Sequence, residues 1–377
     1  MNMNIGEKLK LRRQKAGFTQ EQIATRMNIT RQTLSNWEVG KNIPDINSVI
    51  ALAHIYGLSL DELLLGKIYF KGELTMFPRR TRAEMEAIIR NHYPAASEIK
   101  ELTGGLASQT FFFEANGNQY VFKTGSRKEA FEKEQWVYNQ YQHVLPIRRV
   151  IQIHEPERQP PYAIYDFIEG VKVFDLNRQE LSEVVPSFLQ ILSTLRSLEV
   201  SNSDGYGRFD ETGKAPYPTW LDFVEAIYID KIYNWSAAEK KGLDAEIIDT
   251  AIRKLKSCVS SVTLRKKQLI HGDLGSFNVI ADRGHISGMI DWSLSMYGDH
   301  LYDIANLLFW NEDKLQPLLT HLKAMYSNSP ETENTLHCYM LRIGLEELYN
   351  TVILQEAGYD VEWVANRLQR IAKDMAG

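Results

Sequence analysis

The chain has 377 residues, of which 44% are hydrophobic and 24% charged, and its formal net charge is −5 at pH 7. This composition is typical of a globular protein and excludes a disordered, collagen-like or small disulfide-stapled chain. Only Cys258 and Cys338 are present, without zinc-site spacing, and no apolar run is long enough to span a membrane. We therefore expect a cytoplasmic protein of two or three domains with no membrane partner.

Charge is unevenly distributed along the chain. The first 66 residues hold eight Lys and Arg against six Asp and Glu, which leaves a net charge of −7 for the remainder. A mildly basic head suits a polyanion and an acidic body suits a cationic ligand. Net charges this small indicate only the sign of charge that a partner of each part would carry.

Short amphipathic helices are predicted in the N-terminal segment, because apolar residues recur there at three- and four-residue spacings between Gly, Asn and Pro breaks. Thr19 and Gln22 predict a capped helix that runs to Met27, and Thr30 caps a second helix through Trp37. Two helices about a tight turn make a helix-turn-helix. The alternative is a small helical bundle that contacts protein.

The second of these helices carries side chains that can bond base edges in the major groove, because Arg, Gln and Asn form bidentate contacts with guanine or adenine. The segment resembles the helix-turn-helix family of phage repressors and related bacterial regulators. The resemblance implies that residues 1–66 bind double-stranded DNA, and such proteins often read palindromes as dimers, so a homodimer is an open expectation. It implies a phosphate contact from Gln20 and base contacts from Arg31, Gln32 and Asn36.

A linker is predicted near residues 67–80, because the segment around Pro78 mixes charged, polar and apolar residues without a regular period. Residues 99–124 follow as two β-rich runs around Asn116 and Gly117, which is a hairpin signal. Gly104 and Gly105 precede this pair of strands, where a backbone without side chains can lie close to a phosphate chain.

A lysine and a glutamate then occur in the order that kinases use to hold nucleotide phosphates. Lys123 ends a predicted strand, and the predicted helix 128–141 carries Glu132 and Glu134. Glu134 is our preferred partner for Lys123, and Glu132 stays an alternative because the helix register is inferred. The segment 163–170 reads as a buried strand that ends in a glycine, which is the place of the adenine-binding hinge in a kinase-like fold.

The most informative run is LIHGDLGSFNVIADRGHISGMIDWS at residues 269–293. His271, Asp273 and Asn278 have the spacing H-x-D-L-x-x-x-N of a phosphotransferase catalytic loop, and Asp291 follows a short predicted hairpin. The chemistry requires a base that reaches the acceptor hydroxyl and two hard oxygen ligands that meet at magnesium. Four unrelated surface residues in this order would be a rare coincidence.

Protein kinases read D-F-G where this chain reads Asp291, Trp292 and Ser293, which favours a small-molecule kinase. The runs HGD, IDW and GDHLYDIANLLFW resemble the aminoglycoside phosphotransferase family, and the likeness extends over about residues 95–375. The resemblance implies an α+β, protein-kinase-like two-lobe fold preceded by a small all-α helix-turn-helix domain. The β-rich N-lobe is expected at 81–168 and the helical C-lobe at 169–377.

The resemblance also implies the cofactors and the roles of individual residues. The cofactors are ATP, with GTP left open, and Mg²⁺. Asp273 is the expected base, and Asn278 and Asp291 are the expected metal ligands. The expected nucleotide contacts are Gly104, Gly105, Ser108, Lys123, Glu134 and the hinge residues Asp166, Phe167 and Ile168.

The implied acceptor is an aminoglycoside-like antibiotic, with hygromycin B as the first candidate. Residues 201–236 hold six acidic and three basic residues among aromatics, which suits a polycationic sugar. An amphipathic surface helix is the alternative, and Glu346 and Glu347 in the C-terminal region have the same status. Asp299 and Asp303 are also expected to brace the loop of Asp291. The expected acceptor contacts are Asp222, Glu225, Trp235, Trp292 and Asp299.

Two other functions remain open from the sequence. The chain could be a transcription regulator whose kinase-like domain senses a nucleotide or drug, or a kinase of another small-molecule alcohol. The intact set of Lys123, Asp273, Asn278 and Asp291 favours an enzyme, because pure binding does not require the base.

Overall fold

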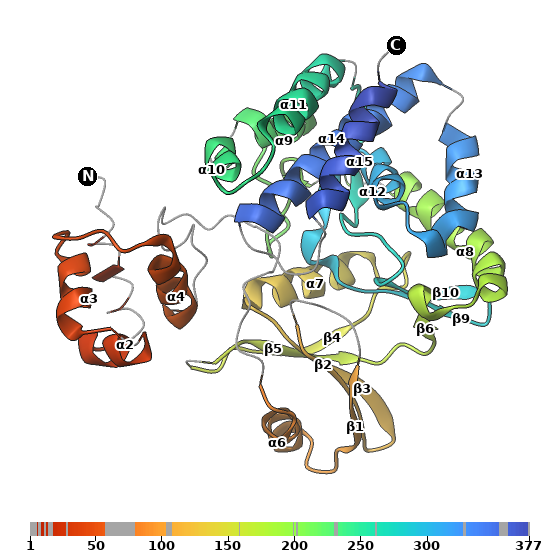
Figure 1. Ribbon diagram of the computed structural model, residues 1–377. Helices are drawn as coiled ribbons and strands as arrows, with labels where there is room; N and C mark the ends of the chain where they lie inside the picture. The colour runs from red at the N-terminus through yellow and green to blue at the C-terminus, as the bar shows by residue number, and fades with distance from the viewer. Residues whose placement is uncertain are drawn as a thin grey trace.

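The computed structural model describes residues 6, 9–10, 13, 18–27, 29–56, 80–102, 108–157, 159–198, 200, 203–229, 233–260, 262–326, 329–353 and 361–375 (Figure 1). Most of the expected linker and the glycine pair Gly104 and Gly105 lie outside these residues.

The N-terminal part is helical, as predicted. Thr19 and Gln22 form a capping box at the start of α2 (Gln20–Arg26), and Thr30 caps α3 (Arg31–Glu38). A third helix, α4 (Ile46–Tyr56), follows. The apolar face of α3 supplies Leu34 and Trp37 to a small core shared with the other helices. Burial of this face leaves the polar side of α3 exposed.

A five-stranded antiparallel sheet forms the smaller lobe, in the order β1-β2-β3-β5-β4. The predicted hairpin is present between β2 and β3, where Asn116 and Gly117 have φ of 53° and 77°, as a two-residue hairpin turn requires. The strands are β1 (Ser97–Leu102), β2 (Thr110–Ala115), β3 (Asn118–Thr124), β4 (Val150–His154) and β5 (Tyr162–Asp166).

A helix covers each face of this sheet. α6 (Arg82–His92) packs on one face against Phe111, Phe113 and Phe122, and α7 (Lys128–Tyr141) packs on the other against Val121. Successive strand side chains point to opposite faces, so Lys123 lies on the same face as Val121, toward α7. Figure 1 shows α7 between the sheet and the larger lobe.

The larger lobe is mainly helical and encloses the main core. Its central helix is α14 (Pro330–Ile353), which packs against α11, α12 and α15. The other helices are α8 (Arg178–Ser197), α9 (Trp220–Ile229), α10 (Trp235–Lys240), α11 (Ala245–Val259), α12 (Leu301–Trp310), α13 (Gln316–Tyr326) and α15 (Val361–Asp374), with 3-10 turns η1 (Val173–Asp175), η2 (Trp292–Leu294) and η3 (Asp313–Leu315).

Two small antiparallel sheets position the loops of this lobe. One has the order β10-β9-β6 and the other β7-β11-β8. The strands are β6 (Val171–Lys172), β7 (Gly207–Arg208), β8 (Gln268–Ile270), β9 (Val279–Asp282), β10 (His285–Met289) and β11 (Met296–Gly298). Within the described residues, no helix has both the length and the apolar character needed to cross a membrane. The architecture is the expected two-lobe kinase-like fold.

Candidate phosphotransfer site

The run from His271 to Asn278 forms the loop between β8 and β9. Gly272 has φ of 83°, and a Cβ at this position would lie 2.2 Å from the Leu294 carbonyl oxygen. Only glycine fits this close approach. The turn lets His271 stay fully buried while Asp273 is half-buried.

Asn278 holds Asp273 in place through its side-chain amide. Its Nδ2 donates to the backbone oxygen of Asp273 and to Oδ2 of the same residue, each at 2.9 Å. Burial, and then the nearby Asp291 carboxylate, raise the pKa of Asp273 to about 7, although the bond from Asn278 acts in the opposite direction. The carboxyl group therefore has the proton affinity expected of a general base near neutral pH.

Asp291 belongs to the larger lobe and contacts Lys123 of the smaller lobe. It adopts a left-handed conformation with φ of 64°, which aspartate tolerates better than most residues. Its Oδ2 lies 3.3 Å from Nζ of Lys123, and Ser293 donates to its Oδ1. Burial raises the pKa of Asp291, but the Lys123 ammonium and the Ser293 hydroxyl, with a smaller contribution from His271, together lower it by more, so the net pKa is below its ordinary value. Asp291 is held as a carboxylate.

Glu134, not Glu132, faces Lys123. The Lys123 Nζ lies 3.4 Å from Oε1 of Glu134, and both side chains are almost fully buried. Glu132 instead pairs with Lys128 one helical turn away, at 2.7 Å. The preferred register of α7 is the one observed.

His271 links the loops of Asp273 and Asp291. Its Nε2 donates to the Ile290 carbonyl at 3.0 Å, and its Nδ1 accepts from the Asp273 N–H at 3.3 Å. Burial lowers the pKa of His271 to about 4, so the ring is neutral and can accept this bond. The histidine of the motif thus has a positioning role.

Two carboxylates on and after α12 support the catalytic loop. Asp303 accepts from the backbone N–H groups of His271 and Gly272 at 2.8 and 2.9 Å. Glu312 accepts from the backbone and the hydroxyl of Ser276. Asp303 braces the loop of Asp273 directly, not that of Asp291 as the sequence led us to expect. Glu312 was missed, because a glutamate after a helix carries no sequence signal of its partner.

Lys133 ties α7 to the segment that follows Asp291. Its side chain is 0% exposed, and its Nζ donates to the carbonyls of Ser293 and Ser295 at 2.8 and 2.7 Å. The ammonium also lies 4.4 Å above the Phe209 ring. Adjacent Lys133 and Glu134 are both buried, so one small-lobe helix contacts Lys123 and the larger lobe. Lys133 was not selected from the sequence, because its partners lie 160 and 162 positions away.

The side chains at this site fit magnesium. Because Asn278 donates to Asp273 through Nδ2, its Oδ1 atom can serve as a metal ligand. Asp291 adds carboxylate oxygens. Magnesium commonly binds through one or two protein oxygens plus water and substrate phosphates. Among the described residues, no group of three or more His, Cys, Asp or Glu side chains is arranged to hold a metal ion by itself.

The hinge residues differ in what they offer a nucleotide. The Asp166 and Phe167 N–H groups donate to the carbonyls of Arg149 and Gln119, and the Asp166 carboxylate pairs with Arg149. Only the Ile168 N–H is without a hydrogen bond among these three described residues. Ser108 is half-buried, and residues 103–107 before it lie outside the described residues.

The five predicted acceptor contacts are engaged in local structure. Asp222 caps the start of α9 through Thr219, Glu225 accepts from Tyr228, and Trp235 donates to the Ile227 carbonyl. Each of these three side chains keeps an exposed portion. They stay predictions as acceptor contacts.

Trp292 and Asp299 require a correction. Trp292 is 1% exposed, and Asp299, at 6%, accepts from the Tyr339 hydroxyl and the Leu301 N–H. Neither side chain has surface to offer an acceptor, so both are structural. Glu346 is also buried, where it pairs with Arg208 and Arg342 at 2.7 and 2.9 Å.

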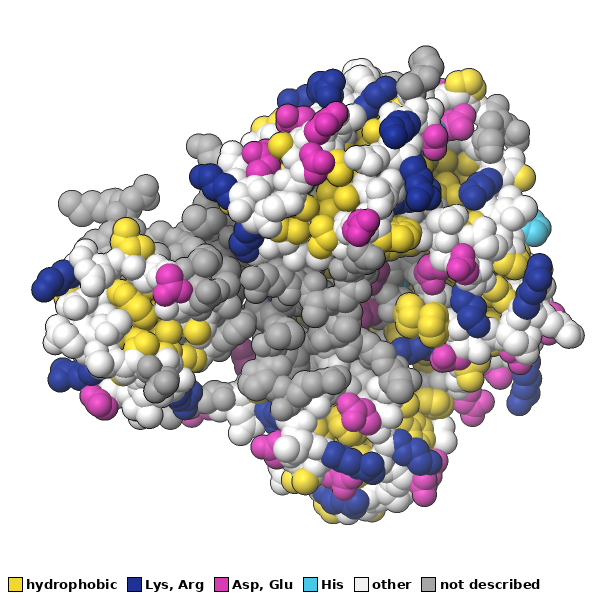
Figure 2. All heavy atoms as spheres, in the orientation of Figure 1, with side chains coloured by type: hydrophobic (Ala, Val, Ile, Leu, Met, Phe, Trp, Pro, Cys, Tyr) yellow, Lys and Arg dark blue, Asp and Glu magenta, His cyan; other side chains and the backbone are white. Residues whose placement is uncertain are grey.

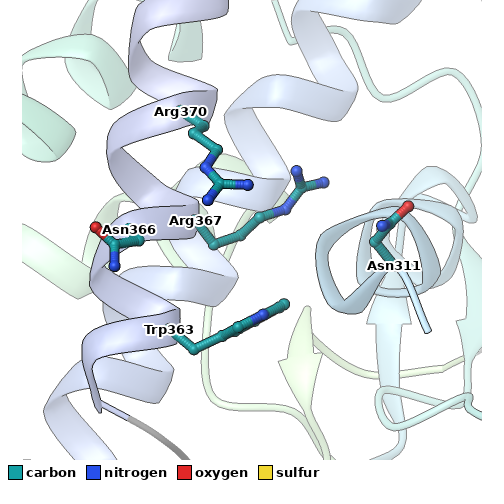
Figure 3. Close-up of a pocket in the computed structure, with 5 residues that line it drawn as sticks. All are labelled: Asn311, Trp363, Asn366, Arg367 and Arg370. Carbon is teal, nitrogen blue, oxygen red and sulfur yellow. The ribbon is translucent and has the colours of Figure 1, made fainter. Parts of the chain in front are cut away.

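A cavity of about 140 Å³ lies between the end of α12 and α15 (Figure 3). Arg367 in its wall donates to the carbonyls of Leu308 and Phe309 and thereby caps α12. No predicted site residue lines this cavity. Its lining residues are Asn311, Trp363, Asn366, Arg367 and Arg370.

In the helix-turn-helix, the predicted DNA contacts lie on α2 and α3. Gln32 donates to Asn36 across one helical turn at 3.0 Å, and Arg31 is exposed beside them. Gln20 donates to Glu38, which is buried and paired with Arg13. One amide hydrogen of Gln20 is therefore used internally, while the α3 face is open.

Comparison with known proteins identifies both parts. The model of the phosphotransferase enzyme family, abbreviated APH, matches residues 98–336, and a helix-turn-helix family model matches residues 9–63. Since the first match covers more than half of the chain, the chain belongs to the APH phosphotransferase family, here with a helix-turn-helix domain at its N-terminus.

Individual relatives agree with this assignment. Hygromycin-B 4-O-kinase of Escherichia coli is 29% identical over 307 residues, which cover 80% of this chain and 88% of that enzyme. The crystal structure of a thermostable mutant of aminoglycoside phosphotransferase APH(4)-Ia in ternary complex with ADP and hygromycin B has a TM-score of 0.71 at 28% identity, covering 78% of this chain and 99% of the other. The regulator ImmR of Bacillus subtilis is 42% identical over 62 residues, 16% of this chain and 49% of its own length.

Proposed function

We propose that this protein transfers the γ-phosphate of ATP to a hydroxyl of an aminoglycoside-like acceptor, with hygromycin B as the first candidate. The observation that carries the proposal is the convergence of Asp273, Asn278 and Asp291 opposite Lys123, which is itself held by Glu134. Phosphoryl transfer needs this set because positioning and charge neutralisation supply most of the catalysis.

Each side chain has a defined part in the proposed reaction. Asp273 accepts the proton of the acceptor hydroxyl as its oxygen bonds to the γ-phosphorus, and the bond to the β–γ bridging oxygen breaks to release ADP. Lys123 binds nucleotide phosphates, and the Ile168 N–H is available to the adenine. Asn278 and Asp291 would hold Mg²⁺, which neutralises charge on the phosphate oxygens when bound. ATP is proposed over GTP because relatives were solved with ADP and AMP-PNP.

Local charge favours a cationic acceptor. Asp303 and Glu312 lie close enough to the base to raise the pKa of Asp273, after the larger effects of burial and Asp291. Figure 2 shows Lys and Arg interspersed with Asp and Glu over the coloured parts of the visible face. The excess of carboxylates at the catalytic loop is the feature that suits an amino sugar.

We propose the domain division that the sequence predicts. We assign residues 1–66 to the DNA-binding domain, 67–80 to a linker, 81–168 to the N-lobe and 169–377 to the C-lobe. The DNA contacts assigned to Gln20, Arg31, Gln32 and Asn36 belong to this proposal, as do a cytoplasmic location and a homodimer on palindromic DNA.

A coupled assay of ADP release tests the enzyme. The full-length protein is mixed with Mg-ATP and a panel of aminoglycosides that includes hygromycin B, and Asp273→Asn is the matched variant. Turnover that depends on an aminoglycoside and is lost in the variant supports the proposal. Turnover only with a metabolic alcohol would assign the protein to another acceptor. A biological effect that survives Asp273→Asn would favour the regulator.

A further inference from the structure

Two exposed phenylalanine rings stack on each other, and one of them belongs to the loop that carries the proposed base. Phe277 lies on the catalytic loop directly before Asn278, and Phe174 lies on η1 after the hinge. The ring centroids are 4.0 Å apart with an interplanar angle of 23°. Phe277 is 46% exposed and Phe174 39%. Large apolar side chains with this much exposure, paired and next to a catalytic loop, point to a binding surface.

The backbone fixes this pair relative to the site. The Phe174 N–H donates to the Ser276 carbonyl at 3.0 Å, and Ser276 is bound by Glu312. Phe277 therefore follows Ser276, which is held by Phe174 and by Glu312. It precedes Asn278, whose amide bonds the Asp273 carboxylate. Adjacent Cα atoms are about 3.8 Å apart, so the Phe277 backbone lies within a few ångströms of the Asn278 side chain that holds the base.

The surroundings define the chemistry of the occupant. Within the described part of the chain, no cation pairs with Glu312, whose carboxylate binds only Ser276. Glu312 binds Ser276, the residue before Phe277, so a carboxylate and an apolar ring pair belong to the same stretch of the loop. This combination suits a molecule with a flat apolar face and an ammonium group. A protonated amino sugar has both features.

We propose that the Phe174–Phe277 pair is the wall of the acceptor site, against which the apolar face of an amino-sugar ring packs while one hydroxyl reaches Asp273. This assignment rests on the proposed function and deepens it, because it names specificity-determining residues that sequence analysis did not select. The principal rival is that the rings contact the ribose of the nucleotide.

Steady-state kinetics of the full-length protein separates these possibilities. The variants are Phe277→Ala, Phe277→Leu and Phe277→Tyr, assayed with Mg-ATP and an aminoglycoside that the wild type phosphorylates. Met325→Ala is the matched control, because Met325 is 54% exposed on α13, outside the site. We expect Phe277→Ala to raise the acceptor KM about tenfold with the KM for ATP changed less than about twofold, Leu to restore part of the affinity and Tyr most of it.

Each contrary outcome has a distinct meaning. A rise in the KM for ATP without a change for the acceptor would place the rings at the nucleotide and overturn the inference. Unchanged constants in Phe277→Ala, or equal effects of Met325→Ala, would also overturn it. A wild type that phosphorylates no aminoglycoside would instead contradict the proposed function. Equal thermal unfolding of wild type and variants confirms that the comparison concerns folded protein.

Discussion

Asn278 binds Asp273 twice, once at its backbone oxygen and once at its carboxylate, and both distances are 2.9 Å. The five-residue spacing of the motif is explained by this geometry, because the amide closes the loop upon itself. The same side chain leaves Oδ1 for a metal ion. One residue therefore orients the base and contributes to the proposed magnesium site.

Replacing Asp273 by Asn is expected to lower kcat by about 10²–10⁴-fold, because the amide cannot accept the hydroxyl proton. Binding of the full-length protein to DNA should not change, since α2 and α3 belong to a separate core. Asp249→Asn on the exposed side of α11 is the matched control. Retained phosphorylation in Asp273→Asn would contradict the role of base.

Replacing Lys133 by Met is expected to weaken catalysis without direct contact to substrate. The variant loses two bonds from α7 to the segment after Asp291, at 2.8 and 2.7 Å, so Glu134 and Asp291 are less well aligned on Lys123. We expect kcat to fall about tenfold or more, because a small misplacement of catalytic groups is costly. Lys133→Arg, which keeps the charge, should recover part of the rate. Equal rates in wild type and Lys133→Met would refute this positioning role.

Local signals in the sequence predicted much of this fold. The caps at Thr19 and Thr30, the Asn116–Gly117 turn and the helix 128–141 are encoded by neighbouring residues and were confirmed. The catalytic motif was equally visible because its spacing is short.

Contacts between distant segments were not predictable in the same way. The Asp303 carboxylate meets the backbone of His271, 32 positions earlier, and Lys133 meets Ser295 across 162 positions. Trp292 was expected at the acceptor, yet its side chain enters the core. Periodicity and motif spacing carry no information about such partners, since only the packed lobes bring them together.

Replacing Glu346 by Gln is expected to destabilise the larger lobe by about 3–5 kcal/mol, because two buried arginines lose their carboxylate. Burial tends to raise the pKa of Glu346, but Arg208 and Arg342 lower it by more, to below its ordinary 4.5. The charge therefore stabilises the fold fully above about pH 4.5, and this contribution is lost as pH falls below that value.

Urea unfolding monitored at pH 7 and at pH 4 measures this difference. The gap between wild type and Glu346→Gln should be smaller at pH 4. Glu239→Gln, at an exposed position on α10, should have little effect at either pH. A gap that does not depend on pH, or that widens at pH 4, would be inconsistent with a lowered pKa.

Replacing Asn36 by Ala is expected to reduce the sequence preference of DNA binding and leave phosphotransfer intact. Asn36 accepts from Gln32 on α3, so its loss would remove the proposed base contact and free its neighbour. A lost base contact costs about 1–3 kcal/mol of discrimination. Selection from random duplexes by the full-length wild type and variant checks this expectation. An identical selected sequence would exclude Asn36 from base recognition.

The most direct measurement is analysis of the reaction product by mass spectrometry and phosphorus NMR after incubation of the full-length protein with Mg-ATP and hygromycin B or related aminoglycosides. We predict one phosphate ester per acceptor molecule, formed with one ADP, and none with Asp273→Asn. Intact aminoglycosides after prolonged incubation with folded wild type that binds Mg-ATP would contradict the assignment of Asp273, Asn278, Asp291 and Lys123 as an aminoglycoside phosphotransfer site.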